Sequence, residues 1–229
     1  MFVYNCTYAL PYNKYFHLIK PLKKNEFHCR VVTLMHAVVV VLASAWSIFI
    51  NRSWPYSSLG GSSTNLQIFV CIFSLGYFLF DFAWCLYHRA EGFVMLFHHC
   101  LTMLGLWVTL FREAHGSEII ATIFFAEITN PLLQIRCFQK DVTQNMHNKL
   151  NDSKHVAKNI AVIDFLFFTL FTIMRLVLGS HFLIMYLSSK EPDVLARAGC
   201  ICIYAISWLF WVQMVKYIKK TYFQKEKND

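Results

Sequence analysis

The sequence contains few charged residues. Only 15% of its 229 residues are Asp, Glu, Lys or Arg, whereas 57% are hydrophobic, and the mean hydropathy is +0.44. An ordinary soluble domain carries about 25% charged residues, so this balance excludes that class. The length is that of one domain, and the apolar excess indicates a protein that lies in a membrane.

The chain also lacks the cysteine patterns of metal-binding proteins. None of its eight cysteines belongs to a CxxC motif, and five lie inside apolar segments: Cys71, Cys85, Cys100, Cys200 and Cys202. Buried cysteine usually behaves as a small hydrophobic side chain. The sequence therefore predicts no metal site. It also disfavours a di-iron hydroxylase or desaturase, which needs several clusters of imidazole and carboxylate ligands.

What the chain does contain is six apolar segments of membrane-spanning length: residues 31–50, 66–87, 93–111, 118–135, 160–187 and 194–215. A helix needs about 20 apolar residues to cross the hydrocarbon core, and it satisfies its backbone groups within one segment. We therefore expect an all-α, polytopic membrane protein. The fourth segment is the weakest, because it carries Glu127, Asn130 and Pro131. The chain then divides into a cytoplasmic N-terminal arm, one helical domain and a basic cytoplasmic tail: residues 1–26, 27–222 and 223–229.

Basic residues are concentrated on one side of such a bundle. Of the 21 Lys and Arg residues, sixteen lie in the N-terminal arm, the second and fourth loops and the C-terminal tail, and four lie at the other three loops. Because cytoplasmic loops carry an excess of Lys and Arg, we expect both termini to be cytoplasmic. Anionic lipid on that leaflet explains the net charge of +8. No nucleic-acid partner is expected, since the basic residues are dispersed over membrane-flanking loops.

Two adjacent histidines, His98 and His99, lie inside the third apolar segment. Imidazole is costly there, and such residues usually face a bundle interior or a hydrated cavity. With a rise of about 1.5 Å per residue, both lie ~8–9 Å inside the cytoplasmic boundary. Other spans place polar side chains at similar depths: Asp81 at ~9 Å, Glu127 at ~12 Å, Asn130 at ~7 Å, His36 at ~8 Å and Asp164 at ~6 Å.

This shared depth predicts one cavity in the cytoplasmic half of the bundle. We expect it to be lined by four candidate catalytic residues: His98, His99, Asp81 and Glu127. Four further residues are candidates for a lipid pocket: Asn130, Asp164, Arg175 and His36.

Several of these residues also have a purely structural explanation. His36 could pack as a hydrogen-bonded histidine. Asp164 could cap the start of the fifth span. Asp81 lies too far from either helix end for capping, so it could instead pair with a histidine or arginine inside the bundle.

The fourth and fifth spans leave two more alternatives open. The stretch Glu127-x-x-Asn130-Pro131 could mark a kink whose freed carbonyls are met by side chains. Arg175 lies deep in the fifth span and needs a partner there, either a carboxylate in an internal ion pair or a lipid head group.

Two stretches of the sequence carry a family resemblance. They read FDFAWCLYHRAEGFVMLFHHCLTMLG over residues 80–105 and FFAEITNPLLQIRCF over residues 124–138. Together they resemble the TLC domain family, which is named after the translocating-chain-associating and longevity-assurance proteins. The likeness spans roughly residues 27–222. It is strongest to the small TLC domain-containing proteins of the transmembrane protein 136 (TLC domain-containing protein 5) subgroup, which share GYFLFD, the histidine pair and a Glu-x-x-Asn/Thr-Pro-x-x-x-x-Arg stretch in this order.

The resemblance implies a membrane bundle of the endoplasmic reticulum type that handles lipids. In the ceramide synthases of this family, an intramembrane histidine pair transfers an acyl group from acyl-CoA to a sphingoid amine, and His98 and His99 match that pair by position. The synthases continue with a His-Asp and a second Asp, whereas this chain reads Ala-Glu-Ile-Thr-Asn-Pro over residues 126–131. The synthase motif is therefore only half present.

The function expected from the sequence is a multi-pass membrane protein that binds or senses lipids and influences membrane lipid composition. The alternative is a lipid acyltransferase related to ceramide synthase. One histidine would then act as general base on an amine or hydroxyl, oriented by Asp81 or Glu127, with acyl-CoA as a substrate. No cofactor is expected, and membrane lipids are the expected partners. Lys225 and Lys227 resemble a dilysine retrieval signal, which predicts residence in the endoplasmic reticulum.

Overall fold

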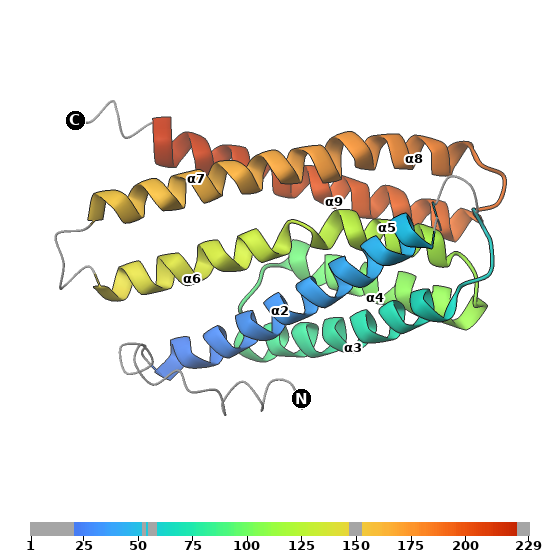
Figure 1. Cartoon of the computed structure of the whole chain (residues 1–229), viewed down its shortest axis with the longest axis horizontal. Coiled ribbons are helices and arrows are strands. Elements are labelled where there is room, and N and C mark those ends of the chain that lie inside the picture. The colour runs from blue at the N-terminus through green and yellow to red at the C-terminus, as the bar shows by residue number, and fades with distance from the viewer. Residues whose placement is uncertain (1–20, 52–53, 55–58, 147–152, 224–229) are drawn as a thin grey trace.

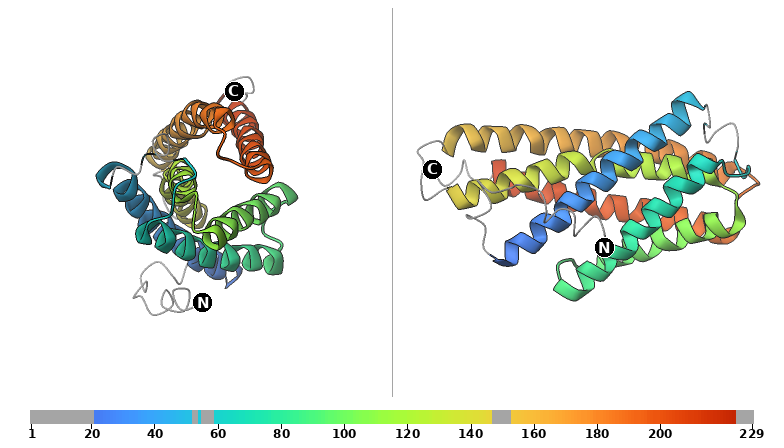
Figure 2. Two further views of the ribbon diagram at one scale, coloured as in Figure 1. Left: turned by 90° about the vertical axis from the view of Figure 1, so that its right-hand side faces the viewer. Right: turned by 60° about the horizontal axis from the view of Figure 1, so that its bottom comes forward.

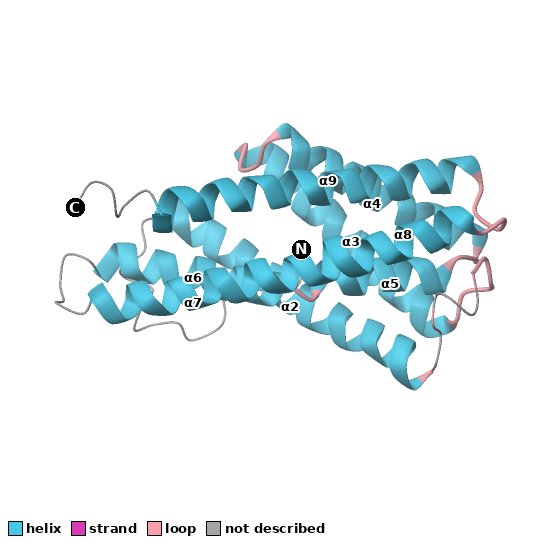
Figure 3. Cartoon of the chain, turned by 90° about the horizontal axis from the view of Figure 1, so that it is seen from above, coloured by secondary structure: helices cyan, strands magenta, loops and turns pink. Residues whose placement is uncertain are grey.

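A computed structural model of the chain describes residues 21–51, 54, 59–146 and 153–223. Within these residues the secondary structure is helical, joined by short loops, with one isolated β-bridge between Ser62 and Ala114 (Figure 3). The lysines of the predicted retrieval signal, Lys225 and Lys227, lie outside the described residues.

The described helices form six spans. The first three spans are α2 with η2, then α3, then α4: Pro21–Ala45, Trp46–Ile50, Asn65–His88 and Phe93–Arg112. The fourth span consists of α5 and α6: Gly116–Glu127 and Asn130–Met146. The fifth consists of α7, η3 and α8: Ser153–Phe171, Thr172–Leu178 and Gly179–Ser188. The sixth consists of α9 and η4: Val194–Ile218 and Lys219–Phe223. All six are long and apolar enough to cross a membrane, which confirms the predicted all-α membrane fold.

Successive spans run in opposite directions, so the loops gather at the two ends of the bundle (Figure 1). The start of α2, the loop between α3 and α4, the facing ends of α6 and α7, and the end of α9 lie at one end. This end carries Arg30, Arg89, Arg136 and Lys216, and we call it the basic end. Its assignment to the cytoplasm stays a prediction from the charge distribution.

The fourth span lies in the middle of the bundle. Figure 2 shows α5 and α6 between α2 and α3 on one side and the last two spans on the other. Helix α5 packs against α2, α3 and η3, and α6 packs against α2 and α7. Because this span faces protein on several sides, it can carry Glu127 and Asn130 without exposing them to hydrocarbon. Its low apolarity follows from its central position.

Large apolar side chains cover the outside of the bundle. Leu42, Trp46, Phe111, Val177 and Ile184 are each more than half exposed. In a soluble protein such surfaces mark interaction sites, whereas in a membrane they face acyl chains. The apolar core lies between the spans and includes Val40, Val70, Leu106, Ile120 and Phe124.

At the end of the bundle opposite the basic end, polar side chains cap helices and join neighbouring loops. Thr64 caps α3 in a capping box with Gln67. Asp193 caps α9 by accepting a hydrogen bond of 2.8 Å from the backbone N–H of Ala196, and it also pairs with Arg112. These contacts fix the loops that set the relative positions of α3, α4 and α9.

Candidate functional site

A polar cavity of about 630 Å³ lies toward the basic end. It is bordered by α2, α3, α4, the end of α5, α6, α7, η3 and α9. Seven of the eight residues singled out from the sequence line it: Asp81, His98, His99, Glu127, Asn130, Asp164 and Arg175. The shared depth of these residues thus corresponds to a shared cavity, although their chemical roles stay predictions.

His36 is the one predicted residue that lines neither this cavity nor the apolar one described below. Its ring stacks on Tyr77 with the ring centroids 3.8 Å apart, and its Nε2 lies 3.4 Å from the hydroxyl of Ser74. Its Nδ1 lies 3.9 Å from a carboxylate oxygen of Glu127, behind the cavity wall. The structure therefore places His36 in packing contact with the candidate site.

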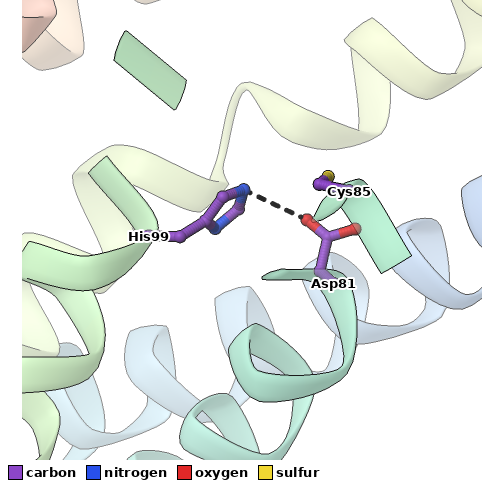
Figure 4. Close-up of side chains that lie close together, drawn as sticks. All are labelled: Asp81, Cys85 and His99. Atoms are coloured by element: carbon purple, nitrogen blue, oxygen red, sulfur yellow. Dashed lines mark ion pairs between the residues drawn. The ribbon is translucent and has the colours of Figure 1, made fainter. Parts of the chain in front are cut away.

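The two adjacent histidines have different surroundings. His99 is 5% exposed, and its Nε2 lies 3.4 Å from Oδ2 of Asp81 (Figure 4). The ring of His98 packs edge-on against Phe210, and its Nδ1 has no hydrogen-bond partner in the described part of the chain. Neighbouring residues on a helix point about 100° apart, which separates the two rings. His99 therefore belongs to an acid–imidazole pair through its Nε2, whereas the Nδ1 atoms of both histidines have no hydrogen-bond partner in the described part of the chain.

Asp81 is tied to a neighbouring helix through its other oxygen. The thiol of Cys29 on α2 donates a hydrogen bond of 3.7 Å to Oδ1 of Asp81. Cys85 follows one turn after Asp81 on α3 and lines the same cavity. Three elements therefore converge on this carboxylate, which accounts for an ionisable group at membrane depth.

The fourth span breaks between α5 and α6, where the sequence placed a kink. Pro131 has no backbone N–H, so the helix cannot continue through it with a full set of hydrogen bonds. The carbonyl of Ala126 accepts a hydrogen bond of 2.8 Å from Nη2 of Arg175 and one of 3.1 Å from the hydroxyl of Thr129. Side chains therefore meet a carbonyl that the break frees.

The same break presents a short polar chain to the cavity. The side-chain amide of Asn130 donates a hydrogen bond of 2.9 Å to Oε2 of Glu127, and Gln134 donates one of 3.2 Å to the side-chain oxygen of Asn130. Glu127 is only 6% exposed. The kink and the candidate site are thus one feature, because the residues that form the break also line the cavity.

The hydrogen-bond partners of Asp164 come from other helices and could not be identified from its place in the sequence. It lies in the middle of α7 and does not cap a helix end. Its carboxylate accepts hydrogen bonds from Arg136 on α6, from Tyr217 at 3.0 Å and from Tyr222 at 2.8 Å. This cluster clamps three spans together at the basic end and forms one wall of the cavity.

Arg175 lies in η3, a stretch of π-helix, a form that is often found at functional sites. Its guanidinium lies 5.1 Å from the ring centroid of Phe171 and bonds the Ala126 carbonyl, while its Nε has no hydrogen-bond partner. Among the described residues, no carboxylate lies within 4.0 Å of it. Of the two partners left open by the sequence, a carboxylate or a lipid head group, the described residues supply neither; Arg175 bonds a backbone carbonyl instead.

An apolar cavity of about 350 Å³ adjoins the polar one and extends from it toward the end of the bundle opposite the basic end. Its walls come from α4, α5, α8 and α9 and include Gly105, Ile119, Phe125 and Phe182. The two cavities share four lining residues: Phe78, His98, Glu127 and Arg175. The polar and apolar spaces therefore meet at the level of the first histidine.

Sequence reasoning missed several residues of the site. Arg136 lies in the family stretch, but its charge and position indicate only a cytoplasmic loop residue. The apolar surroundings of Cys85 in the sequence indicate only a hydrophobic residue. Tyr217 and Tyr222 gave no signal, because their contact with Asp164 depends on how the fifth and sixth spans pack.

Comparison with known proteins agrees with this architecture. The family model described as the TLC domain matches residues 26–219. A relative, TLC domain-containing protein 4 A of Dictyostelium discoideum, is 25% identical over 129 residues, which are 54% of this chain and 49% of that protein. The aligned part of the chain thus spans about half the length of this curated relative. No solved structure matches the chain.

The family match covers the second to fifth spans entirely, the first span from residue 26 onward, and all but the last four residues of the sixth. It includes the broken fourth span and both cavities. Together with the six spans, it fits a membrane protein linked to lipid biology. This chain belongs to the TLC domain family.

Proposed function

We propose that this protein binds a membrane lipid in the two adjoining cavities and thereby influences the lipid composition of its membrane. The observation that carries this proposal is the junction of a polar and an apolar cavity at Phe78, His98, Glu127 and Arg175. A lipid has the same division, with a polar head group and an apolar chain. Both volumes lie in or near the range of small-molecule sites, roughly 300–1,000 Å³.

The two ends of the site fit the two ends of such a ligand. The polar cavity offers the guanidinium of Arg175 and amides of Asn130 and Gln134. The apolar cavity offers mostly aliphatic and aromatic side chains from four helices. We therefore assign the head group to the basic end and the chain to the opposite half.

Filling the apolar cavity tests lipid binding directly. Gly199 lines this cavity, and a Cβ placed on it would meet no atom within 4 Å. Gly199→Trp should therefore reduce the lipid that co-purifies in mild detergent, as measured by mass spectrometry of the extracted protein. Gly76→Trp is the matched control, because Gly76 is also open, lies on the exposed outside of α3 and lines neither cavity. Equal lipid content in both variants would contradict the proposal.

A second candidate function is lipid acyl transfer, favoured by the position of His98. Its ring lines both cavities and therefore lies at their junction, where the carbonyl of a bound acyl chain would lie. As general base, this histidine would take the proton from an amine or hydroxyl that attacks the thioester carbonyl of acyl-CoA. An amide or ester bond forms, the carbon–sulfur bond breaks, and the thiol of CoA leaves.

Release of free CoA separates the two candidates. Purified protein would be incubated with acyl-CoA and a panel of lipid amines and alcohols, and thiol release would be compared with that of His98→Ala combined with His99→Ala. Transfer predicts release and an acylated product that depend on the histidines. Release equal to that of the double variant would exclude histidine chemistry and leave lipid binding as the function.

The cellular effect has its own test. Lipid profiling of membranes that lack the protein should show a change that wild-type protein reverses. If the double histidine variant accumulates normally and fails to reverse the change, the pair acts in function. If its abundance falls, the pair serves folding. We further propose residence in the endoplasmic reticulum, to be tested by co-localisation of the tagged protein with a marker of that membrane.

A further inference from the structure

A group of three potential metal ligands lies in the wall of the polar cavity. The ligand atoms of Asp81, Cys85 and His99 all lie within 4.8 Å of one another. Figure 4 shows the Asp81 carboxylate on α3 directed toward the His99 ring on α4, with the Cys85 side chain close to Asp81. Residues four apart on a helix share a face, so α3 supplies a carboxylate and a thiol as a ready pair. It is the one group of this kind among the residues that the structure describes.

The spacing of two of these atoms fits coordination better than a hydrogen bond. Nε2 of His99 and Oδ2 of Asp81 are 3.4 Å apart. A charge-assisted hydrogen bond between such groups would measure about 2.7–2.9 Å. A tetrahedral zinc ion, with bonds of about 2.0–2.2 Å to nitrogen and oxygen, holds its ligands roughly 3.3–3.5 Å apart. The Cys85 sulfur lies within 4.8 Å of the other two ligand atoms, and a side-chain shift of roughly 1 Å would bring it to the spacing of about 3.6 Å that a tetrahedral zinc site requires.

The chemistry of the set fits the same ion. One imidazole, one carboxylate and one thiolate form a mixed ligand set that zinc accepts, whereas magnesium and calcium prefer oxygen ligands. One carboxylate and one thiolate also balance the two positive charges of the ion. The complex would therefore be neutral, and this matters for groups buried within a membrane span.

We propose that Asp81, Cys85 and His99 bind a zinc ion with three protein ligands. The thiol of Cys29, which contacts the other oxygen of Asp81 at 3.7 Å, would hold the carboxylate in place from outside the ligand set. Three-ligand zinc sites keep a fourth position for water or a substrate atom, and because all three ligands line the polar cavity, such a position would be open to it. With His99 engaged as a ligand, the role of base in acyl transfer falls to His98.

Metal analysis of the purified full-length protein tests this site. We expect about one zinc per chain, either as purified or after incubation with zinc sulfate and removal of excess metal. Cys85→Ala, His99→Ala and Asp81→Ala should each lower the content severalfold. Cys71→Ala is the matched control, because Cys71 is also buried on α3 but lies outside the cavity wall.

Cobalt spectroscopy identifies the ligands independently of metal content. Protein loaded with cobalt chloride should show a near-ultraviolet charge-transfer band from thiolate to metal. The band should persist in Cys71→Ala and disappear in Cys85→Ala. Zinc content below about a tenth of an equivalent after incubation, or a band that survives Cys85→Ala, would overturn the site.

The proposals of lipid binding and of a metal site can be tested independently of each other. The co-purified lipid would be measured in the same preparations, with Gly199→Trp as the variant that fills the apolar cavity. Zinc bound by Gly199→Trp at the wild-type level would show a metal site that does not depend on lipid. Bound lipid with no zinc would overturn the metal site alone.

Discussion

Arg175 donates a hydrogen bond of 2.8 Å to the backbone carbonyl of Ala126, across the gap between the fifth span and the break in the fourth. This single contact joins a π-helical segment to the end of α5. It holds a cation at the junction of the two cavities while it satisfies a carbonyl that the break exposes. Structure and candidate function therefore depend on the same side chain.

Arg175→Met should destabilise the protein. The variant keeps an unbranched side chain but leaves the Ala126 carbonyl with the Thr129 hydroxyl alone. Hydrogen bonds from charged donors contribute about 1.5–3 kcal/mol, and we expect a loss of this order in the free energy of unfolding. Thermal unfolding in detergent would measure it. The control is Lys190→Met, which removes an exposed cation from a loop and should leave the midpoint unchanged.

Asn130→Ala should cost about 1–3 kcal/mol, because it removes the amide that donates to the buried Glu127 carboxylate. Asn130→Asp should cost more, since it places a second carboxyl group beside the first. Asn159→Ala on the exposed side of α7 serves as the control. Unfolding midpoints that are equal in Asn130→Ala and Asn159→Ala would show that the polar chain at the break does not contribute to stability.

Replacing the two tyrosines that bond Asp164 should lower the stability of the protein in a non-additive way. Tyr217 and Tyr222 donate to the same carboxylate oxygen, so either phenol can partly replace the other. We expect Tyr222→Phe to cost about 1 kcal/mol and the double Phe variant to cost more than the sum of the single variants. Tyr87→Phe, at an 84% exposed position, is the control. Strict additivity would mean that the two phenols act independently.

Gly116→Ala should destabilise the start of α5. A Cβ at this position would lie 2.5 Å from Oε1 of Gln67 and 2.7 Å from the hydroxyl of Ser63, which is closer than real contacts allow. Overpacking of this kind costs about 1–3 kcal/mol. Gly76→Ala in the middle of α3 meets no atom within 4 Å and should be neutral or stabilising by up to about 1 kcal/mol. A lower unfolding midpoint for Gly116→Ala alone would show tight packing at Gly116. A lower midpoint for both variants would show that glycine is needed in these helices for another reason.

Acid should loosen the loop before the sixth span. Asp193 lies outside the membrane-spanning segments, and its hydrogen bond from the Ala196 backbone N–H, followed by that from Arg112, lowers the pKa of its carboxyl group below the ordinary value of 3.8. A lowered folded-state pKa means that the ionised form stabilises the fold above pH 3.8, and this contribution is lost as the pH falls through the lowered pKa.

Hydrogen exchange in the first turn of α9 would follow this loss. Exchange at Ala196 should accelerate as the pH is taken below about 4, after correction for the intrinsic pH dependence of exchange. Asp193→Asn retains a good capping residue but no titrating group, so its corrected exchange should vary less with pH. An identical pH profile in the two proteins would assign the effect to another group.

The sequence was sufficient to predict the six spans, because helix length and apolarity are fixed by the thickness of the bilayer. It also located the break in the fourth span, since Pro131 removes a backbone donor wherever it stands in a helix. The depth of the polar residues followed from the rise per residue. These properties depend on the local chain alone.

The direction in which each side chain points from its helix axis could not be predicted in the same way. His36 was placed by its depth along the first span, yet its ring packs on Tyr77 and does not line either cavity. Asp164 meets Tyr217 and Tyr222 from the sixth span, and Cys85 meets His99 from the third. Such contacts depend on how neighbouring spans rotate and cross. That information lies in the packing of the whole bundle.

The central place of the fourth span also bears on how the protein enters the membrane. This span has the lowest mean hydropathy of the six, 1.2 against 1.7–2.2 for the others. Its Glu127 and the guanidinium of Arg175 reach the chain's interior from different spans, and the Ala126 carbonyl gains its bond from Arg175 only when the fifth span is in place. During synthesis, a nascent chain that ends after the fourth span could already pair Glu127 with Asn130 and the Ala126 carbonyl with Thr129, but it would lack the bond from Arg175. We therefore expect the middle of the protein to reach its full stability in the membrane only after the fifth span has been inserted.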